Sequence, residues 1–197
     1  MIRPTAIDGL LVIERSTRTD ERGFFREPFR LDELEAAAGG PVRFVQQNHA
    51  RSRRGVLRGL HAENWEKLVY VPQGRVFVAV ADIRPESATF GKVATFVLGD
   101  GGENEESAES GDDAAGEGKR LSLFLPRRLG HGYCVLSETA DYVYLVTEYY
   151  DGSDTHAVRW DDPDLAVPWP AIDPILSERD RHNPSLREIA PAAFATA

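Results

Sequence analysis

Histidine, lysine and tyrosine side chains stand in strand-like segments of this sequence, where they could meet. His61 ends a glycine-containing apolar segment and is followed six residues later by Lys67, at the head of an apolar run. His131 lies between two glycines, and Tyr142 and Tyr144 alternate in a later run. A base, a cation and a phenol are the groups needed to move a proton on a carbon next to a carbonyl. The combination favours proton-transfer chemistry.

The histidines do not form a metal-binding pattern. The chain has five of them, without a His-x-His pair, and a single cysteine, Cys134. A metal site needs three or four converging His, Cys or carboxylate ligands. We therefore predict no metal, although ligands converging from distant strands would leave no such pattern. One cysteine also excludes an intramolecular disulfide.

Each of these residues also has an ordinary structural interpretation. A histidine can be a core residue bonded to backbone, and a lysine at a strand edge can reach solvent. On a straight strand, however, Lys67 shares a face with Val69 and Val71, which directs its ammonium toward the interior. A buried cation needs an anion, and an enolate or a phosphate would serve. Tyr142 and Tyr144 share one face, which either lines a pocket or lies outside.

The elements that must position these groups are mostly strands. Runs rich in β-branched and aromatic residues predict strands, and Pro126 ends one of them. Helical patterns are few: Leu31–Ala38, ended by Gly39-Gly40, and a short turn at Ser177-Glu-Arg-Asp180. The pattern predicts an all-β sandwich or barrel in a single domain, residues 1–197. The predicted strands are 42–47, 68–71, 75–83, 92–98, 121–125, 132–136 and 142–150, the last two flanking a turn at 137–141.

The net charge of −9 has a local origin. Residues 99–118 hold eight acidic residues and no basic one, which leaves 23 basic against 24 acidic residues elsewhere. This segment of Gly, Ser, Ala and acids cannot bury apolar surface, so we interpret it as a flexible loop insertion. There is no glycine-rich phosphate loop, no basic helix, no signal peptide and no apolar stretch of membrane length. We expect a cytoplasmic protein that binds neither nucleic acid nor membrane.

A series of short motifs follows in fixed order along the chain: Asp20-Glu-Arg-Gly-Phe-Phe25, Phe44-Val-Gln-Gln-Asn-His49, Gly55-Val-Leu-Arg-Gly-Leu-His61, Asp82-Ile-Arg84, Thr89-Phe-Gly91, His131-Gly132, Leu136-Ser-Glu-Thr-Ala140, Trp160-Asp-Asp-Pro-Asp164 and Ile175-Leu-Ser177. This series resembles the dTDP-4-dehydrorhamnose 3,5-epimerase family. The resemblance runs from about Ile7 to Leu186, interrupted by the acidic insertion.

The resemblance implies a cupin-type jelly-roll barrel without metal or cofactor. It also implies a homodimer whose N-terminal strands cross the interface, and a nucleotide-diphosphate 4-keto-6-deoxy sugar as substrate. His61 matches the family's base and Asp180 the carboxylate paired with it; Tyr144 matches the general acid, and Lys67 the cation near the keto oxygen. Positions that contact nucleotide or sugar are matched by Arg22, Glu27, Gln46, Asn48, Arg58, His131 and Arg179, with Arg22 and Glu27 reaching the neighbouring subunit's site.

Three departures from the family's pattern leave substrate and regiochemistry open. Ala62-Glu63 replaces an aromatic residue and Gln, the segment between His61 and Lys67 is short, and Arg179 replaces a common lysine. Inversion at C3, C5 or both, a GDP- or CDP-linked sugar, and an inactive sugar-nucleotide-binding barrel are the alternatives. Strict alternation also places Arg58 and His61 on opposite faces, and a bulge at Gly59 would bring them together.

Overall fold

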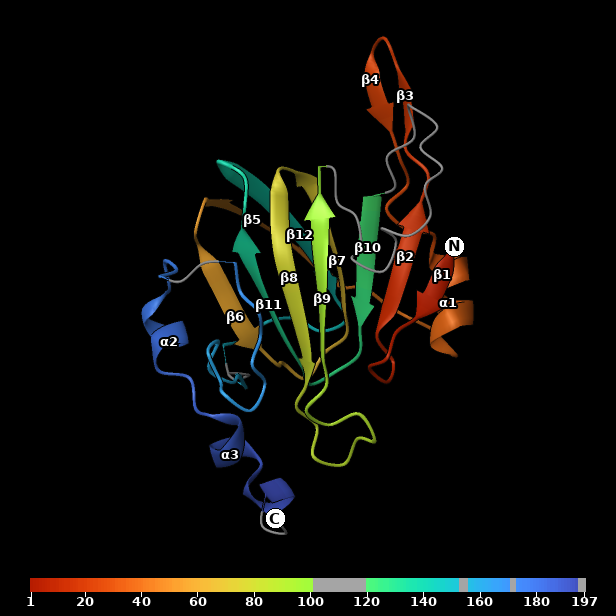
Figure 1. Cartoon of the computed structure of the whole chain (residues 1–197). Helices are drawn as coiled ribbons and strands as arrows, with labels where there is room; N and C mark the ends of the chain where they lie inside the picture. Colours follow the sequence, from red (N-terminus) through yellow and green to blue (C-terminus); the bar gives the residue numbers. More distant parts are fainter. Residues whose placement is uncertain (101–119, 153–155, 171–172, 195–197) are drawn as a thin grey trace.

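Two antiparallel sheets form the body of the protein in a computed structural model (Figure 1). The structure describes residues 1–100, 120–152, 156–170 and 173–194, so most of the acidic segment 99–118 lies outside the described residues. The larger sheet has the order β1-β2-β10-β7-β12-β5, and the smaller has the order β6-β11-β8-β9. With few short helices, this is the jelly-roll barrel that the sequence predicts.

The strands of the larger sheet are β1 (Ile2–Pro4), β2 (Leu11–Arg15), β10 (Arg120–Leu125), β7 (Lys67–Gln73), β12 (Thr139–Val146) and β5 (Gln46–Arg53). Those of the smaller sheet are β6 (Leu57–His61), β11 (Leu129–Val135), β8 (Arg75–Asp82) and β9 (Val93–Gly99). The helices are α1 (Leu31–Ala38), α2 (Glu178–Arg181) and α3 (Leu186–Ile189), with a 3-10 turn at Pro191–Phe194.

Three clusters of buried apolar side chains pack against the faces of the two sheets. The largest fills the space between the two sheets and includes Val69, Val78 and Leu123, all fully buried. A second lies on the outer face of the smaller sheet, under the C-terminal segment. A third lies under α1 on the outer face of the larger sheet. Along each strand, the residues between those of the central cluster face outward. A polar residue that lies on the same strand face as the central cluster points into the barrel interior.

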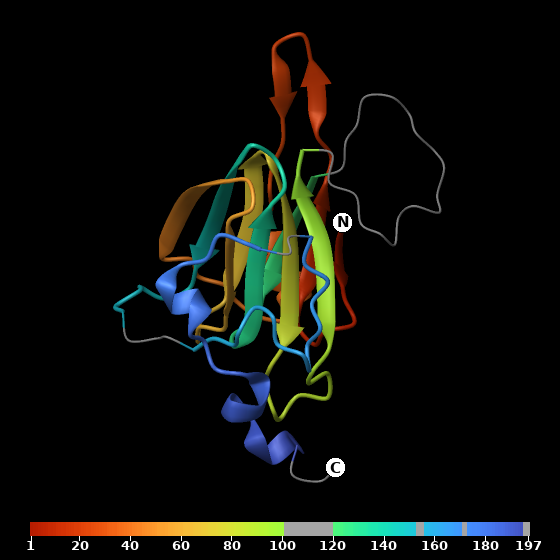
Figure 2. The same ribbon diagram turned by 60° about the vertical axis from the view of Figure 1, so that its left-hand side comes forward.

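A separate hairpin, β3 (Arg18–Asp20) and β4 (Gly23–Phe25), projects beyond the end of the barrel in both views (Figures 1 and 2). Phe24 and Phe25 are 51% and 67% exposed on it. A two-stranded hairpin on its own is marginally stable in water. The Arg120 guanidinium of β10 lies 4.5 Å from the centre of the Phe24 ring, so the hairpin contacts the larger sheet there.

The loop between β8 and β9 explains the Asp82-Ile-Arg84 and Thr89-Phe-Gly91 motifs. The Asp82 carboxylate is fully buried and accepts hydrogen bonds from Arg84, Ser87 and Thr89, at 2.5 to 2.8 Å. Burial by itself raises its pKa, but these donors outweigh that effect and lower the pKa to about 2. The motifs therefore fix the conformation of this loop.

Most predicted elements are confirmed, α1 to the residue. The strand predicted at 42–47 is wrong: β5 covers Gln46–Arg53 instead. β5 is an edge strand that alternates polar residues toward solvent with polar residues toward the interior, so it has no hydrophobic pattern. The sequence does not predict strands β1 to β4, nor the bounds of β6.

The last strand is also shifted. The sequence predicts a turn at 137–141 and a strand at 142–150, but β12 spans Thr139–Val146. Asp141 belongs to the strand because the Arg51 guanidinium on β5 binds its carboxylate at 2.7 and 2.8 Å. Tyr149 and Tyr150 lie beyond the strand and are both exposed.

Candidate active site

Strand register places the candidate residues on interior faces of both sheets. In the larger sheet Tyr144 lies opposite Val69, a central core residue, and Lys67 is two positions from Val69 on the same face. In the smaller sheet His61 lies opposite His131, and Arg58 opposite Tyr133. Directly paired residues of antiparallel strands share a face, so the two sheets present these side chains to the same interior.

A β-bulge brings Arg58 and His61 onto one face, as the sequence leaves open. Two residues separate them on β6, whereas one residue separates their partners Tyr133 and His131 on β11. The backbone of β6 approaches β11 so closely that a Cβ on Gly59 would lie 2.5 Å from the Gly132 Cα. Gly59 also has a φ of +145°, which other residues rarely adopt. The glycines beside Arg58 and His131 are thus required by the bulge.

His61 forms a hydrogen-bonded pair with Asp180. The imidazole Nε2 lies 2.6 Å from Asp180 Oδ1, and the Asp180 side chain is 2% exposed. Burial by itself raises the pKa of Asp180, but the His61 hydrogen bond and smaller effects of Ser177 and the Gly59 N–H hold it below its usual value. Because a carboxylate only accepts, the Nε2 proton belongs to His61, and the neutral ring has an unprotonated Nδ1 that can act as a base.

The short helix α2 delivers Asp180 to this pair. Its N-cap, Ser177, accepts a hydrogen bond from the Asp180 backbone N–H at 3.1 Å. The predicted capping turn is therefore confirmed. The carboxylate of Asp180 does not complete a reciprocal capping box, because it faces His61.

Lys67 is buried and carries its own counter-ion. Its side chain is 7% exposed and donates to Glu63 Oε2, whose side chain is 13% exposed. Burial by itself raises the pKa of Glu63, but the charge and hydrogen bond of Lys67, with a smaller effect of His61, bring it below its usual value. The barrel interior therefore contains the Lys67–Glu63 ion pair, and the Glu63 charge also acts on His61.

Three tyrosines and His131 line the interior beside these groups. The Tyr133 and Tyr142 rings stack with centroids 4.0 Å apart, and the Tyr142 hydroxyl lies 2.8 Å from His131 Nε2. Burial, together with the charges of Lys67 and His61, holds the pKa of His131 well below its usual value, so its ring is neutral. Burial, aided by the Glu63 charge, raises the pKa of Tyr144, which is therefore a protonated phenol at neutral pH.

Three further polar residues lie on the interior faces of the strands at the open edges of the two sheets. Gln46 Nε2 donates to Asn48 Oδ1 at 2.9 Å on β5, and Asn48 lies opposite Tyr144. The Arg58 guanidinium donates to Ser52 Oγ at 3.2 and 3.3 Å, which links β6 to β5. Asn48 lies beside Tyr144 and Arg58 lies on the strand of His61, so these polar side chains are placed to contact a polar ligand in the interior.

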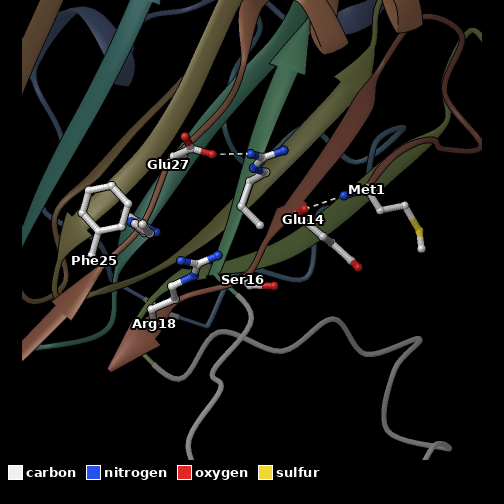
Figure 3. Close-up of a pocket in the computed structure, with 8 residues that line it drawn as sticks. Met1, Glu14, Ser16, Arg18, Phe25 and Glu27 are labelled. Carbon is white, nitrogen blue, oxygen red and sulfur yellow. Dashed lines mark hydrogen bonds and ion pairs between the residues drawn. The ribbon is translucent and has the colours of Figure 1, made fainter. Parts of the chain in front are cut away.

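Arg22 and Glu27 do not lie with the other candidates in this chain. Arg22 is at the tip of the projecting hairpin, with its side chain 85% exposed and bound to Asp20. Glu27 lines a separate pocket of about 330 Å³ at the base of the hairpin, where its carboxylate binds Arg15 (Figure 3). The other residues of this pocket are Met1, Glu14, Ser16, Arg18, Phe25 and Arg26.

Arg179 precedes Asp180 on α2 and is half-buried. Its Nη2 is fully buried and has no hydrogen-bond partner among the described residues. Sequence reasoning missed Tyr133, which stacks on Tyr142 in the interior. The alternation of His131 and Tyr133 on one strand face is the signal that could have identified it.

Metal ligands do not gather in the described parts of the chain. No group of three or more His, Cys, Asp or Glu side chains there could hold a metal ion. Within the same residues, no helix is long and apolar enough to cross a membrane.

Known proteins resemble this chain over nearly its whole length. The family model described as dTDP-4-dehydrorhamnose 3,5-epimerase matches residues 4–106 and 115–188. A dTDP-4-dehydrorhamnose 3,5-epimerase from Pseudomonas aeruginosa is 38% identical over 180 residues, covering 89% of this chain and 90% of its own. A dTDP-4-dehydrorhamnose 3-epimerase from Streptomyces niveus is 34% identical over 184 residues, covering 91% of this chain and 81% of its own.

A solved structure shares the fold. The dTDP-6-deoxy-D-glucose-3,5-epimerase of Legionella pneumophila, determined in complex with dTDP-4-keto-L-rhamnose, superimposes with a TM-score of 0.82 at 36% identity. The match covers 98% of this chain and 96% of that one.

Proposed function

Because the chain belongs to the dTDP-4-dehydrorhamnose 3,5-epimerase family, we propose that His61, Lys67, Tyr144 and Asp180 are the groups with which it inverts carbons next to a sugar ketone. The chain is an isomerase, a sugar-nucleotide epimerase. One observation carries the assignment of residues: His61 on the smaller sheet, paired with Asp180 of α2, faces the same interior as Lys67 and Tyr144 on the larger sheet.

The first step is removal of a proton from a carbon beside the ketone. His61 Nδ1 takes the proton, and the electrons of the C–H bond move into the keto oxygen to give an enolate. Asp180 stabilises the imidazolium that forms. The Lys67 ammonium donates to the enolate oxygen. His131 is neutral, so it can support the oxygen only as a hydrogen-bond donor.

The second step returns a proton to the opposite face of the same carbon. Tyr144 is a protonated phenol in the other sheet and donates its O–H proton, while the enolate electrons form the new C–H bond and the ketone is restored. The enzyme is left with an imidazolium and a tyrosinate, which exchange protons with solvent. Inversion therefore brings a solvent proton onto the carbon.

Solvent-deuterium incorporation tests this assignment and the regiochemistry together. With dTDP-4-keto-6-deoxyglucose in deuterium oxide, we expect deuterium at C3, C5 or both by NMR, and loss of it in His61→Asn. Exchange at one carbon would identify a monofunctional enzyme, which the Streptomyces niveus relative and the replacement by Glu63 favour as a second candidate. Undiminished exchange in a folded His61→Asn variant would refute the role of His61.

The nucleotide is the second part of the proposal, and we assign dTDP because the relatives named above act on or bind dTDP sugars. A ligand that binds the folded state raises its apparent stability. We expect a larger thermal shift with dTDP than with GDP or CDP at equal concentration. The reverse order would support a GDP- or CDP-linked substrate.

The third part is a homodimer in which the projecting hairpin enters the neighbouring subunit's site. Exposed Phe24 and Phe25, and the position of Arg22 away from its own chain's candidates, support it. Mixing Arg22→Ala with His61→Asn tests it, because a mixed dimer has one site with both residues intact. Regained activity relative to either variant alone is expected, and a mixture as inactive as its components would contradict the exchange. The cytoplasmic location expected from the sequence stays a prediction.

A further inference from the structure

Glu63 stands where the epimerases of the rhamnose pathway usually have a glutamine, and it is paired with Lys67 in the interior. Its carboxylate binds the Lys67 ammonium, and both side chains are nearly buried, at 13% and 7% exposure. The same carboxylate is close enough to His61 for the two charges to interact, and it also acts on Tyr144. Glu63 therefore contacts Lys67, and its charge also acts on His61 and Tyr144.

Among the described residues, Glu63 is the one anion that forms an ion pair with Lys67. On its own sheet it lies opposite Leu125 on β10 and Val146 on β12, both apolar. The charge of Lys67 acts on Glu63 and on neutral His131 of β11, and the Tyr144 phenol lies on β12 two positions from Val146, the residue opposite Lys67. His61 of β6, on which the Glu63 charge also acts, is paired with the Asp180 carboxylate. Without Glu63, Lys67 would be a buried cation with no ion-pair partner among the described residues, a costly arrangement that favours loss of its proton.

We propose that Glu63 is a positioning residue that holds the Lys67 ammonium in the interior and keeps it protonated. An ammonium has three donors. One is used by Glu63, which fixes the direction of the other two, so the enolate oxygen meets a donor that is already oriented. This inference rests on the proposed role of Lys67, and it assigns to Glu63 a task that a neutral glutamine could perform only in part.

The rate at which the Lys67 amine is chemically labelled measures its protonation state. Only the deprotonated amine is acetylated by acetic anhydride, and the chain has three lysines, Lys67, Lys92 and Lys119. Mass spectrometry can therefore follow Lys67 as a function of pH, with exposed Lys92 as the internal reference. The midpoint of the curve is compared, because its absolute rate also depends on access.

We expect Glu63→Gln to move the labelling midpoint of Lys67 down by at least about one pH unit, a tenfold change in its proton equilibrium. Glu63→Asp, which keeps the charge at a longer distance, should give a smaller shift in the same direction, and it carries the test if Glu63→Gln does not fold. Glu66→Gln is the matched control, since Glu66 is in the same loop and only its backbone binds Thr147. Its midpoint should equal the wild type.

Activity gives a second readout. In Glu63→Gln, kcat should fall about tenfold at a pH above the new midpoint and change little below it, while KM stays near the wild-type value. Equal midpoints in Glu63→Gln, Glu66→Gln and the wild type would overturn the inference, as would a fall in kcat that is the same at every pH. If the wild type gave no deuterium exchange, the proposed function would fail, and the labelling curves would still decide whether Glu63 controls the charge of Lys67.

Discussion

Replacing Asp180 by Asn tests the His61–Asp180 pair, because asparagine has nearly the same shape as aspartate but carries no charge. The carboxylate is 2% exposed and lies 2.6 Å from His61 Nε2. In Asp180→Asn the charge that stabilises the imidazolium is lost, and the amide can satisfy Nε2–H only through its single oxygen. Breaking a buried charge pair by removing one partner costs about 3–5 kcal/mol. Applied to the transition state, this corresponds to a loss of roughly 10²–10⁴ in kcat.

The assay is the initial rate of deuterium incorporation into the keto sugar, with kcat and KM separated. KM should change by less than about threefold, because the pair acts on charge that develops only in the transition state. Asp161→Asn is the control: it removes a carboxylate from an exposed pair with Arg159, 40% and 46% exposed, and kcat should not change. A folded Asp180→Asn variant with kcat within threefold of the wild type would refute the reasoning.

Three further predictions concern the acid, the bulge and the buried loop. Tyr144→Phe should lower formation of the inverted sugar about 10²–10⁴-fold while deuterium exchange without inversion continues, because His61 still removes and returns a proton; equal loss of both would reassign Tyr144. Gly59→Ala should destabilise the fold by at least about 2 kcal/mol in urea unfolding, because its Cβ meets backbone, whereas a Cβ on Gly40 meets nothing within 4 Å and Gly40→Ala serves as control. Asp82→Asn should cost about 2 kcal/mol at pH 7, since the folded pKa of about 2 lies below the ordinary 3.8. This stability is complete above pH 3.8 and is lost as the pH falls through about 2, so the two proteins should converge in acid; a constant difference would contradict it.

Sequence alone determined the family, the all-β class and the residue types available for proton transfer. Alternation along a strand is local, so it correctly placed Lys67 on the face of Val69 and grouped Tyr142 with Tyr144. Motif order gave Asp180 as the partner of His61, although 119 residues separate them. The edge strand β5 was missed because most of its residues on both faces are polar. The start of β12 was misplaced because Asp141 is a residue typical of turns, and its pairing with Arg51 depends on the neighbouring strand.

Tertiary structure decided how these residues combine. Whether Tyr144 faces the core depends on its pairing with Val69, and whether Arg58 and His61 share a face depends on the close approach of Gly59 to Gly132. Burial lowers the pKa of His131 and keeps its ring neutral, and no local sequence pattern measures burial. These properties arise from contacts between distant segments, and therefore only the folded chain defines the charges that surround the keto oxygen.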